Sequence, residues 1–128
     1  MNVLSRMIDA ARPGGKILDL QVIRPDPFIE LEGRPMARID GAGLFAWADA
    51  AVSAIEARIA AGDLVEEAED DHDVRKHYTG GAELVDDVAQ SKRSLLPHDV
   101  AMLRTLRQPL VVRERCRTRL LTTGRTPR

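Results

Sequence analysis

The sequence contains one cysteine and four aromatic residues in 128 positions, and each scarcity excludes a class of function. The single Cys116 excludes an internal disulfide and any metal site built from several cysteines. Because Cys116 stands in a segment of alternating residues, we interpret it as a small buried side chain rather than a nucleophile. So few aromatic rings argue against a stacking surface for single-stranded nucleic acid.

Net charge is also nearly absent, since 19 Lys and Arg residues balance 20 Asp and Glu residues. No global field therefore draws the chain toward nucleic acid or an anionic membrane, and we expect neither as a partner. No apolar run approaches the roughly 20 residues that span a bilayer. The N-terminus lacks the apolar centre of a signal peptide, which predicts a cytoplasmic protein.

The length of the chain fits one domain with its own core. Hydrophobic periodicity predicts helices at 3–11, 43–61, 82–92 and 97–107 and strands at 16–23, 64–78 and 110–121. The first strand is expected to end before Pro25, and a surface hairpin or an extended excursion is expected around Gly33-Arg34. This alternation predicts a layered α/β fold with about three main strands. The domain is expected to cover residues 1–121, and residues 122–128 to form a disordered tail.

Two of the predicted strands carry rows of opposite charge. Strand 64–78 has an acidic row made of Glu67, Glu69, Asp71 and Asp73. Strand 110–121 has a basic row made of Arg113, Arg115, Arg117 and Arg119. Antiparallel pairing would place both rows on one solvent-exposed face, at about 0.2–1 kcal/mol per pair. The rows predict that these strands are neighbours; the alternative is an anion site or docking surface on the arginines.

No group of residues makes a complete catalytic or metal site. The most metal-like cluster consists of Asp70, Asp71, His72, Asp73 and His77. Its two histidines would point to opposite faces of a strand, so we interpret it as a polar strand end and predict no metal site. His98 and Asp99 are adjacent on a helix and are not expected to face each other, which leaves His98 exposed.

Glycine and serine motifs also fall short of a site. Gly14-Gly15-Lys16 lacks the earlier glycine and the following Ser or Thr of a phosphate loop. The pair Gly41 and Gly43 is interpreted as the turn before the long helix. The serines, which are Ser5, Ser53, Ser91 and Ser94, lie in no nucleophile elbow. We expect Phe45 and Trp47 in the core or in an oligomer contact, and assign no catalytic or cofactor-binding residue.

The run from Met7 to Asp19, which contains Arg12-Pro13-Gly14-Gly15, resembles a recurring segment of class I S-adenosylmethionine-dependent methyltransferases. In that family a helix ends in such a Pro-Gly-Gly turn and enters the fifth strand of a seven-stranded sheet. Three later segments resemble the next helix and the turn into the sixth strand: Arg38-Ile39-Asp40, Phe45 to Ile59, and Ala61-Gly62-Asp63-Leu64. Val111 to Leu120 resembles the closing antiparallel strand, which lies between the fifth and sixth in that family.

The resemblance covers nearly the whole chain but only the second half of the family's Rossmann-like fold. It implies a partial, mixed methyltransferase-like sheet. In the family, the cofactor binds at a glycine-rich loop after the first strand and at an acidic residue that ends the second, and both would precede Met1. The resemblance therefore implies that the isolated chain binds no S-adenosylmethionine, and that it is active only if an N-terminal half completes it.

Two functions from different classes stay open. The first is a methyltransferase-like half domain (truncated, split or degenerate) whose strand edge at 16–23 needs cover. We expect it to form a homo-oligomer through that edge or through helix 43–61, or to bind a complementing N-terminal half. The second is a stand-alone binding or regulatory module that dimerises, with the arginine row or the His72 region contacting a partner. A small metal-dependent enzyme is a third alternative.

Overall fold

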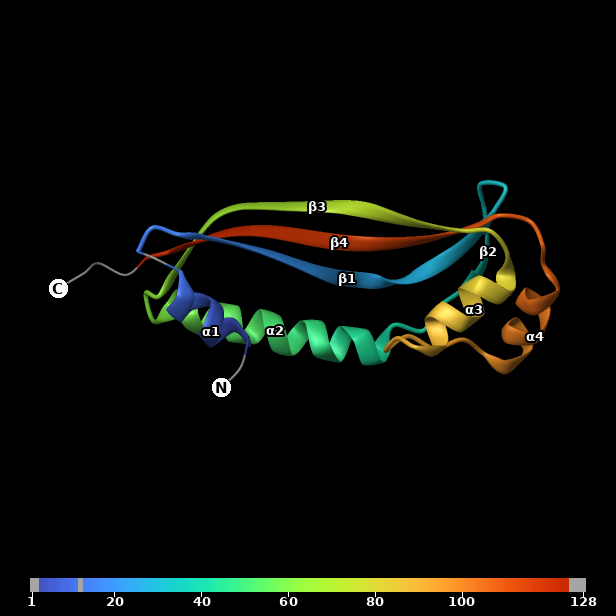
Figure 1. The fold of residues 1–128 in the computed structure, drawn as a ribbon, viewed down its shortest axis with the longest axis horizontal. Helices are drawn as coiled ribbons and strands as arrows, with labels where there is room; N and C mark the ends of the chain where they lie inside the picture. The colour runs from blue at the N-terminus through green and yellow to red at the C-terminus, as the bar shows by residue number, and fades with distance from the viewer. Residues whose placement is uncertain (1–2, 12, 125–128) are drawn as a thin grey trace. The chain divides into compact units, whose positions relative to one another are not determined.

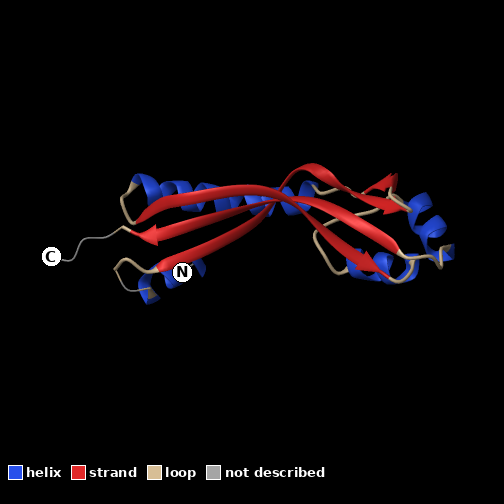
Figure 2. Ribbon diagram, turned by 90° about the horizontal axis from the view of Figure 1, so that it is seen from above, coloured by secondary structure: helices blue, strands red, loops and turns tan. Residues whose placement is uncertain are grey.

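The computed structural model describes residues 3–11 and 13–124. The elements are α1 (Val3–Ala10), β1 (Lys16–Leu31), β2 (Arg34–Arg38), α2 (Ala42–Ala60), β3 (Leu64–Tyr78), α3 (Gly81–Ala89), α4 (Pro97–Thr105) and β4 (Leu110–Thr123). The strands form one sheet in the order β2-β1-β4-β3, and neighbouring strands run antiparallel (Figures 1 and 2). The α/β class is confirmed, and each predicted helix has a counterpart.

The sheet differs from the predicted one in two respects. It has four described strands rather than three, because the predicted hairpin adds β2 to the sheet. In this hairpin Leu31 pairs with Arg34 around a turn in which Glu32 and Gly33 have positive φ. The expectation of a mixed sheet is wrong for the described strands, because β4 lies between β1 and β3 and runs antiparallel to both.

Strand β1 continues to Leu31, so the prediction that it ends before Pro25 is wrong. Pro25 and Pro27 lack the N–H that a central strand needs, but their nitrogens point toward the outer edge of β1, away from β4. The carbonyl of Pro27 shows this direction, since it accepts a hydrogen bond from Ile39 N–H at 2.8 Å on the β2 side. The missing donors therefore fall outside the ladder with β4, where proline is tolerated.

Strand β4 extends to Thr123, two residues beyond its predicted end. Thr123 is buried, and its N–H donates to the carbonyl of Gly15 at 2.9 Å. The expectation of a disordered tail is therefore wrong for residues 122 and 123, and residues 125–128 lie outside the described part of the chain. Among the described helices, none combines the length and the apolar character needed to cross a membrane.

The chain divides into two compact units, of which unit 1 contains residues 1–21, 47–71 and 117–128. The buried core of unit 1 consists of Ile17, Ile55, Leu64 and Leu121, with Leu4, Ile8 and Ile59 packed against it. These contacts place α1 and α2 against the same face of the strands of this unit (Figure 1). Gly62, with a φ of +84°, ends the helix in the left-handed conformation that its position predicts.

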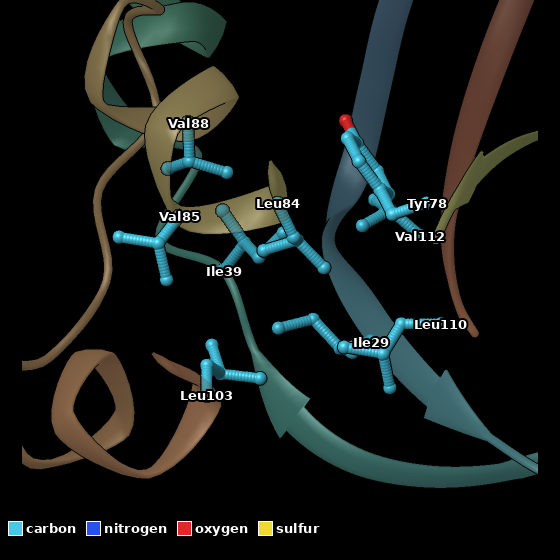
Figure 3. Packing of buried hydrophobic residues seen from close by; sticks show 9 residues of the cluster. All are labelled: Ile29, Ile39, Tyr78, Leu84, Val85, Val88, Leu103, Leu110 and Val112. Atoms are coloured by element: carbon cyan, nitrogen blue, oxygen red, sulfur yellow. The ribbon is translucent and has the colours of Figure 1, made fainter. Parts of the chain in front are cut away.

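Unit 2 contains residues 22–46 and 72–116, and its core lies between α3, α4 and the strands (Figure 3). The buried members of this core are Ile29, Ile39, Tyr78, Leu84, Val85, Val88, Leu103, Leu110 and Val112. Cys116 is 4% exposed, which confirms that it is a small buried residue. Its burial, and after that the charge of the neighbouring Glu114, raises the pKa of the Cys116 thiol and makes it a poor nucleophile.

Candidate interaction site

The two predicted charge rows meet, because β3 and β4 are antiparallel neighbours. In unit 2, Arg115 contacts Asp73 at 3.0 Å. In unit 1, Arg117 donates two hydrogen bonds to Asp71, at 2.7 and 3.0 Å, and contacts Glu69 at 3.0 Å. The hydrogen bonds to Asp71 raise the pKa of Arg117 above its usual value. The predicted pairing of the two strands is thus confirmed.

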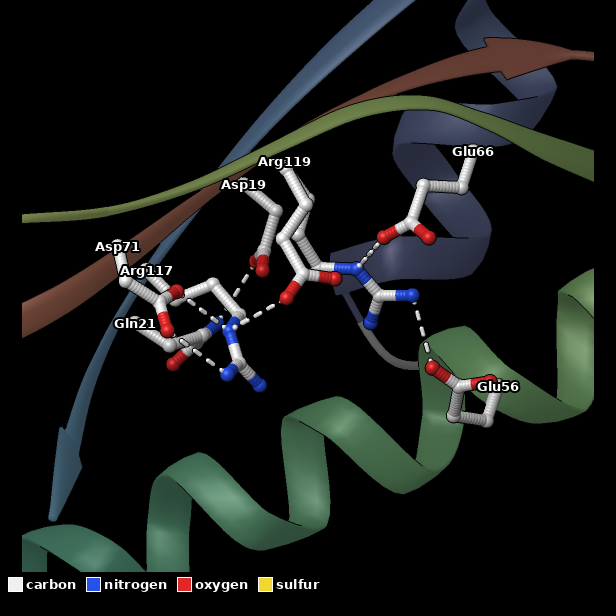
Figure 4. A network of polar contacts seen from close by, with 8 residues as sticks. Asp19, Gln21, Glu56, Glu66, Asp71, Arg117 and Arg119 are labelled. Atoms are coloured by element: carbon white, nitrogen blue, oxygen red, sulfur yellow. Dashed lines mark hydrogen bonds and ion pairs between the residues drawn. The ribbon is translucent and has the colours of Figure 1, made fainter.

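Arg119 does not lie on a solvent-exposed face, contrary to the prediction. Its side chain is 6% exposed and lies between the strands and α2, where it donates to Glu66 at 2.6 Å and to Glu56 at 2.8 Å (Figure 4). Burial opposes the charge of Arg119, but these two hydrogen bonds outweigh it and raise its pKa. Glu67, a member of the predicted acidic row, contacts Lys16 at 2.6 Å rather than an arginine of the basic row. Strand alternation alone does not show which face a helix covers.

Replacing Arg119 with Met is expected to destabilise the protein more than replacing Arg117 with Met. Arg119→Met leaves Glu66 and Glu56 without their buried cation, at a cost of about 2 kcal/mol for charged hydrogen bonds. The Arg117 side chain is 36% exposed, so Arg117→Met is expected to cost at most about 1 kcal/mol. Urea unfolding of both variants measures the difference, and equal costs would contradict the burial of Arg119.

The outer edge of β1 in unit 1, residues 16–21, pairs with no strand in the described part of the chain. Strand β4 lies on the other side, and β2 pairs with β1 only from Phe28 to Leu31. Ile17 is buried toward α2, whereas Leu18 and Leu20 are 67% and 58% exposed. An unpaired edge presents backbone N–H and C=O groups that another strand can bind.

An apolar groove lies beside this edge. It has a volume of about 660 Å³ and is lined by side chains from α1, β1 and α2 together with Leu121. The described part of the chain exposes seven large apolar side chains, and five of them line this groove: Val3, Met7, Leu18, Leu20 and Trp47. Single exposed apolar residues are ordinary, but a group gathered around one groove indicates an interaction surface.

One carboxylate, Asp19, also lines the groove. Its Oδ1 accepts a hydrogen bond from Gln21 Nε2 at 2.7 Å (Figure 4). Its Oδ2 is inaccessible to solvent and accepts no hydrogen bond from the described residues. Buried polar atoms are normally hydrogen-bonded, so this carboxylate oxygen is an unusual feature of the groove.

The other edge of the unit 1 sheet, formed by β3, is protected by charge. Residues 66–71 read Glu-Glu-Ala-Glu-Asp-Asp, and all six are exposed. A dense row of one sign on an edge strand discourages pairing with another strand. The edge suited to binding is therefore that of β1, where residues 16–21 carry only one Lys and one Asp.

The other sequence-based candidates lie in no site. The described residues, 70–77 among them, contain no group of three acidic, His or Cys side chains placed to bind a metal. His98 is exposed as predicted, but it contacts Asp99 at 3.2 Å, contrary to the prediction. The contact lies in the first turn of α4, where the His98 side chain is 78% exposed. Phe45 is buried, in agreement with the prediction that it lies in the core. Trp47 is 65% exposed, so it does not lie in the core.

A buried charge cluster in unit 2 was missed by the sequence analysis. Glu114 is 2% exposed, and its carboxylate accepts a hydrogen bond from Arg93 Nε at 2.6 Å and contacts Lys76 at 3.3 Å. The available signal was the position of Glu114 between Val112 and Cys116 in the alternation. A carboxylate in an inward-facing row needs a buried cation, and the sequence does not show that Arg93 supplies it.

Comparisons with known protein families, curated proteins and solved structures found no match. A functional proposal for this chain therefore rests on the geometry of unit 1. It combines an unpaired strand edge, an apolar groove and a carboxylate oxygen that lacks a donor among the described residues. This combination suits a polypeptide strand, which satisfies the backbone groups of an edge while its side chains fill an adjoining groove.

Proposed function

We propose that this chain is a sheet-completing half domain of methyltransferase-like topology, which binds a partner strand and has no methyltransferase activity by itself. The order of its strands supports the proposal. Helix α2 connects β1 to β3, and β4 lies between these two strands. Since β4 is antiparallel to both neighbours, β1 and β3 run in the same direction. The resemblance gives the fifth, closing and sixth strands this same arrangement.

The open edge of β1 in unit 1 is the observation that carries the proposal. In the methyltransferase-like sheet, the first half of the fold continues beyond the fifth strand, to which β1 corresponds by the Pro-Gly-Gly turn before it. Here no strand in the described part of the chain pairs with that side of residues 16–21, which displays Leu18 and Leu20 beside the groove. An edge of this kind is covered in a stable protein, which favours a partner that supplies the next strand.

The residues of this chain do not fit S-adenosylmethionine. Cofactor sites of this type use the backbone N–H groups of a glycine-rich turn between a strand and a helix. The turn at Gly14-Gly15 precedes a strand instead, and its N–H groups are already used: Gly14 donates to the carbonyl of Thr123 at 3.2 Å, and Gly15 donates to its hydroxyl at 3.0 Å. Any cofactor site would have to come from the partner half.

Calorimetric titration of the purified chain with S-adenosylmethionine is expected to show no binding. The physical reason is that, within the described residues, glycine N–H groups at the starts of α2 and α3 are also already used: Gly41 donates to Asp26 Oδ1 at 3.1 Å, and Gly81 donates to the carbonyl of Leu106 at 2.9 Å. The gene supplies the complementary test: an in-frame strand followed by a glycine-rich loop upstream of the Met1 codon would identify the missing half. Co-expression with that segment is then expected to produce binding, and Leu20→Lys is expected to abolish it. Micromolar binding by the chain alone would contradict the proposal.

A stand-alone dimerising module is the second candidate function. The exposed Trp47 favours it, because this side chain lines the groove from α2 and offers contact area beyond the strand edge. A half domain needs a different polypeptide to gain activity, whereas a dimerising module needs only its own copy. The upstream gene sequence and the mass of the purified chain separate the two.

A further inference from the structure

We infer that two copies of this chain pair antiparallel through the edge of β1 in unit 1, about a two-fold axis at Leu20. The inference rests on the proposed function, since it uses the same open edge. It identifies a second copy of this chain as the partner at this edge when no complementing N-terminal half is bound.

The backbone groups of this edge favour a strand as its binding partner. Residues 16–21 present a row of backbone donors and acceptors, which another strand satisfies and an apolar small molecule does not. The adjoining groove and the exposed side chains of Leu18 and Leu20 add apolar contacts for the side chains of the incoming strand.

Charge favours a second copy of this same strand. Residues 16–23 carry one Lys and one Asp, so two copies of this segment meet with little charge of one sign. The like charges that pairing about Leu20 sets opposite each other, Lys16 and Arg24, lie at the ends of the paired segment and are exposed, where their repulsion is small. Residues 66–71 of β3 carry five charged side chains, and an edge strand dense in charged side chains is a poor partner for another strand even where the charges are paired. Pairing of β1 with β1 leaves β3 at the outer edge of both copies of unit 1, so the association stops at two chains.

The position of the axis follows from the side chains that it brings together. A two-fold axis perpendicular to a sheet places residues of the same face opposite each other, so it passes beside one residue. At Asp19 it would bring two carboxylates together, which is destabilising. At Leu18 it would place Asp19 against an isoleucine, an apolar side chain that offers the carboxylate no hydrogen-bond donor.

An axis at Leu20 resolves both problems. It sets Leu20 against its own copy on the exposed face of the strand. On the face toward α2, it places Asp19 opposite Gln21 of the partner subunit, so that a carboxylate meets a polar side chain with N–H donors rather than an isoleucine. The symmetry provides this contact twice.

A scan of single cysteines tests the pairing and its register. Opposite residues of antiparallel strands have Cα atoms about 4.5–5.5 Å apart, within the range of a disulfide. Under mild oxidation, Leu20→Cys is expected to give far more disulfide-linked dimer than Leu18→Cys or Asp19→Cys. Val65→Cys, an exposed position at the start of β3, is the matched control and is expected to stay monomeric on a non-reducing gel. The native Cys116 is buried, so the unmodified chain gives little background.

Light scattering on a dilution series gives an independent measurement. The chain is expected at about twice its mass of 14.2 kDa, and Leu20→Lys at the mass of the monomer. A monomeric chain, or stronger cross-linking at positions 18, 19 or 65 than at 20, would overturn the inference. A monomer would leave the proposed half domain with its open edge intact, whereas binding of S-adenosylmethionine by a dimer would overturn the half domain and leave the pairing.

Discussion

Gly81→Ala is expected to destabilise the protein by about 3 kcal/mol or more, the upper end of the cost of overpacking a core. A Cβ atom at Gly81 would lie 1.8 Å from the carbonyl oxygen of Leu103, at the contact of α3 with α4. Real Cβ atoms do not approach another atom this closely, so the two helices have to separate. Because the obstacle is a backbone atom, shortening the Leu103 side chain does not relieve it.

Helix propensity acts in the opposite direction at this position, which makes the result informative. Alanine is favoured over glycine in helices by up to about 1 kcal/mol, so without the clash Gly81→Ala would stabilise α3. Gly80→Ala is the matched control, since its Cβ would meet the nearest atom at 3.3 Å and its φ of −170° suits any residue. Urea unfolding of both variants measures the costs. A stability of Gly81→Ala within experimental error of the parent would show that α3 and α4 are not in this contact.

Arg93→Met is expected to cost about 3 kcal/mol, because it leaves a buried carboxylate without its main cation. Glu114 is 2% exposed, and Arg93, with a side chain 13% exposed, contacts it through two guanidinium nitrogens. Met keeps much of the volume and the apolar part of the arginine side chain, so the loss measures charge and hydrogen bonding. Thermal unfolding followed by circular dichroism, with urea unfolding for the free energy, gives the comparison.

Lys76→Met is the control for this cluster. Lys76 contacts the same carboxylate, but its side chain is 41% exposed and its distance to Glu114 is 3.3 Å, so its removal is expected to cost less than about 1 kcal/mol. The double variant Arg93→Met with Glu114→Met is expected to recover most of the loss, because apolar pairs often replace buried ion pairs without penalty. Equal costs for the two single variants would contradict the burial of the Arg93–Glu114 pair.

Local signals were sufficient where a strand or helix is bounded by residues with a specific backbone requirement. Strand β3 was predicted at 64–78 and is observed there, since Gly62 ends the preceding helix and Gly80 follows the strand. The charge rows predicted which strand lies beside it, because their complementarity does not depend on other elements. Pro97 likewise begins α4, as its fixed φ predicts.

Predictions from the sequence pattern were wrong where a neighbouring helix or strand determines how a residue is paired or buried. The length of β1 was underestimated because Pro25 interrupts a strand only if its nitrogen faces a partner, and here it faces the outer edge. The exposure of Arg119 was predicted from alternation, but α2 covers this face and supplies Glu56 as a partner. Burial of Glu114 was overlooked for the same reason, since its cation lies 21 positions away in the sequence.

The sequence by itself determined the order of helices and strands and the pairing of β3 with β4. These properties follow from periodicity, turn residues and charge, which act between near neighbours or along whole strands. Only the tertiary structure decided that Leu18, Leu20 and Trp47 border one groove, and that Asp19 has a buried oxygen without a donor among the described residues. Such a groove depends on how α1 and α2 pack against β1. Packing brings together residues that are far apart in the sequence, and their spacing does not indicate that they are in contact.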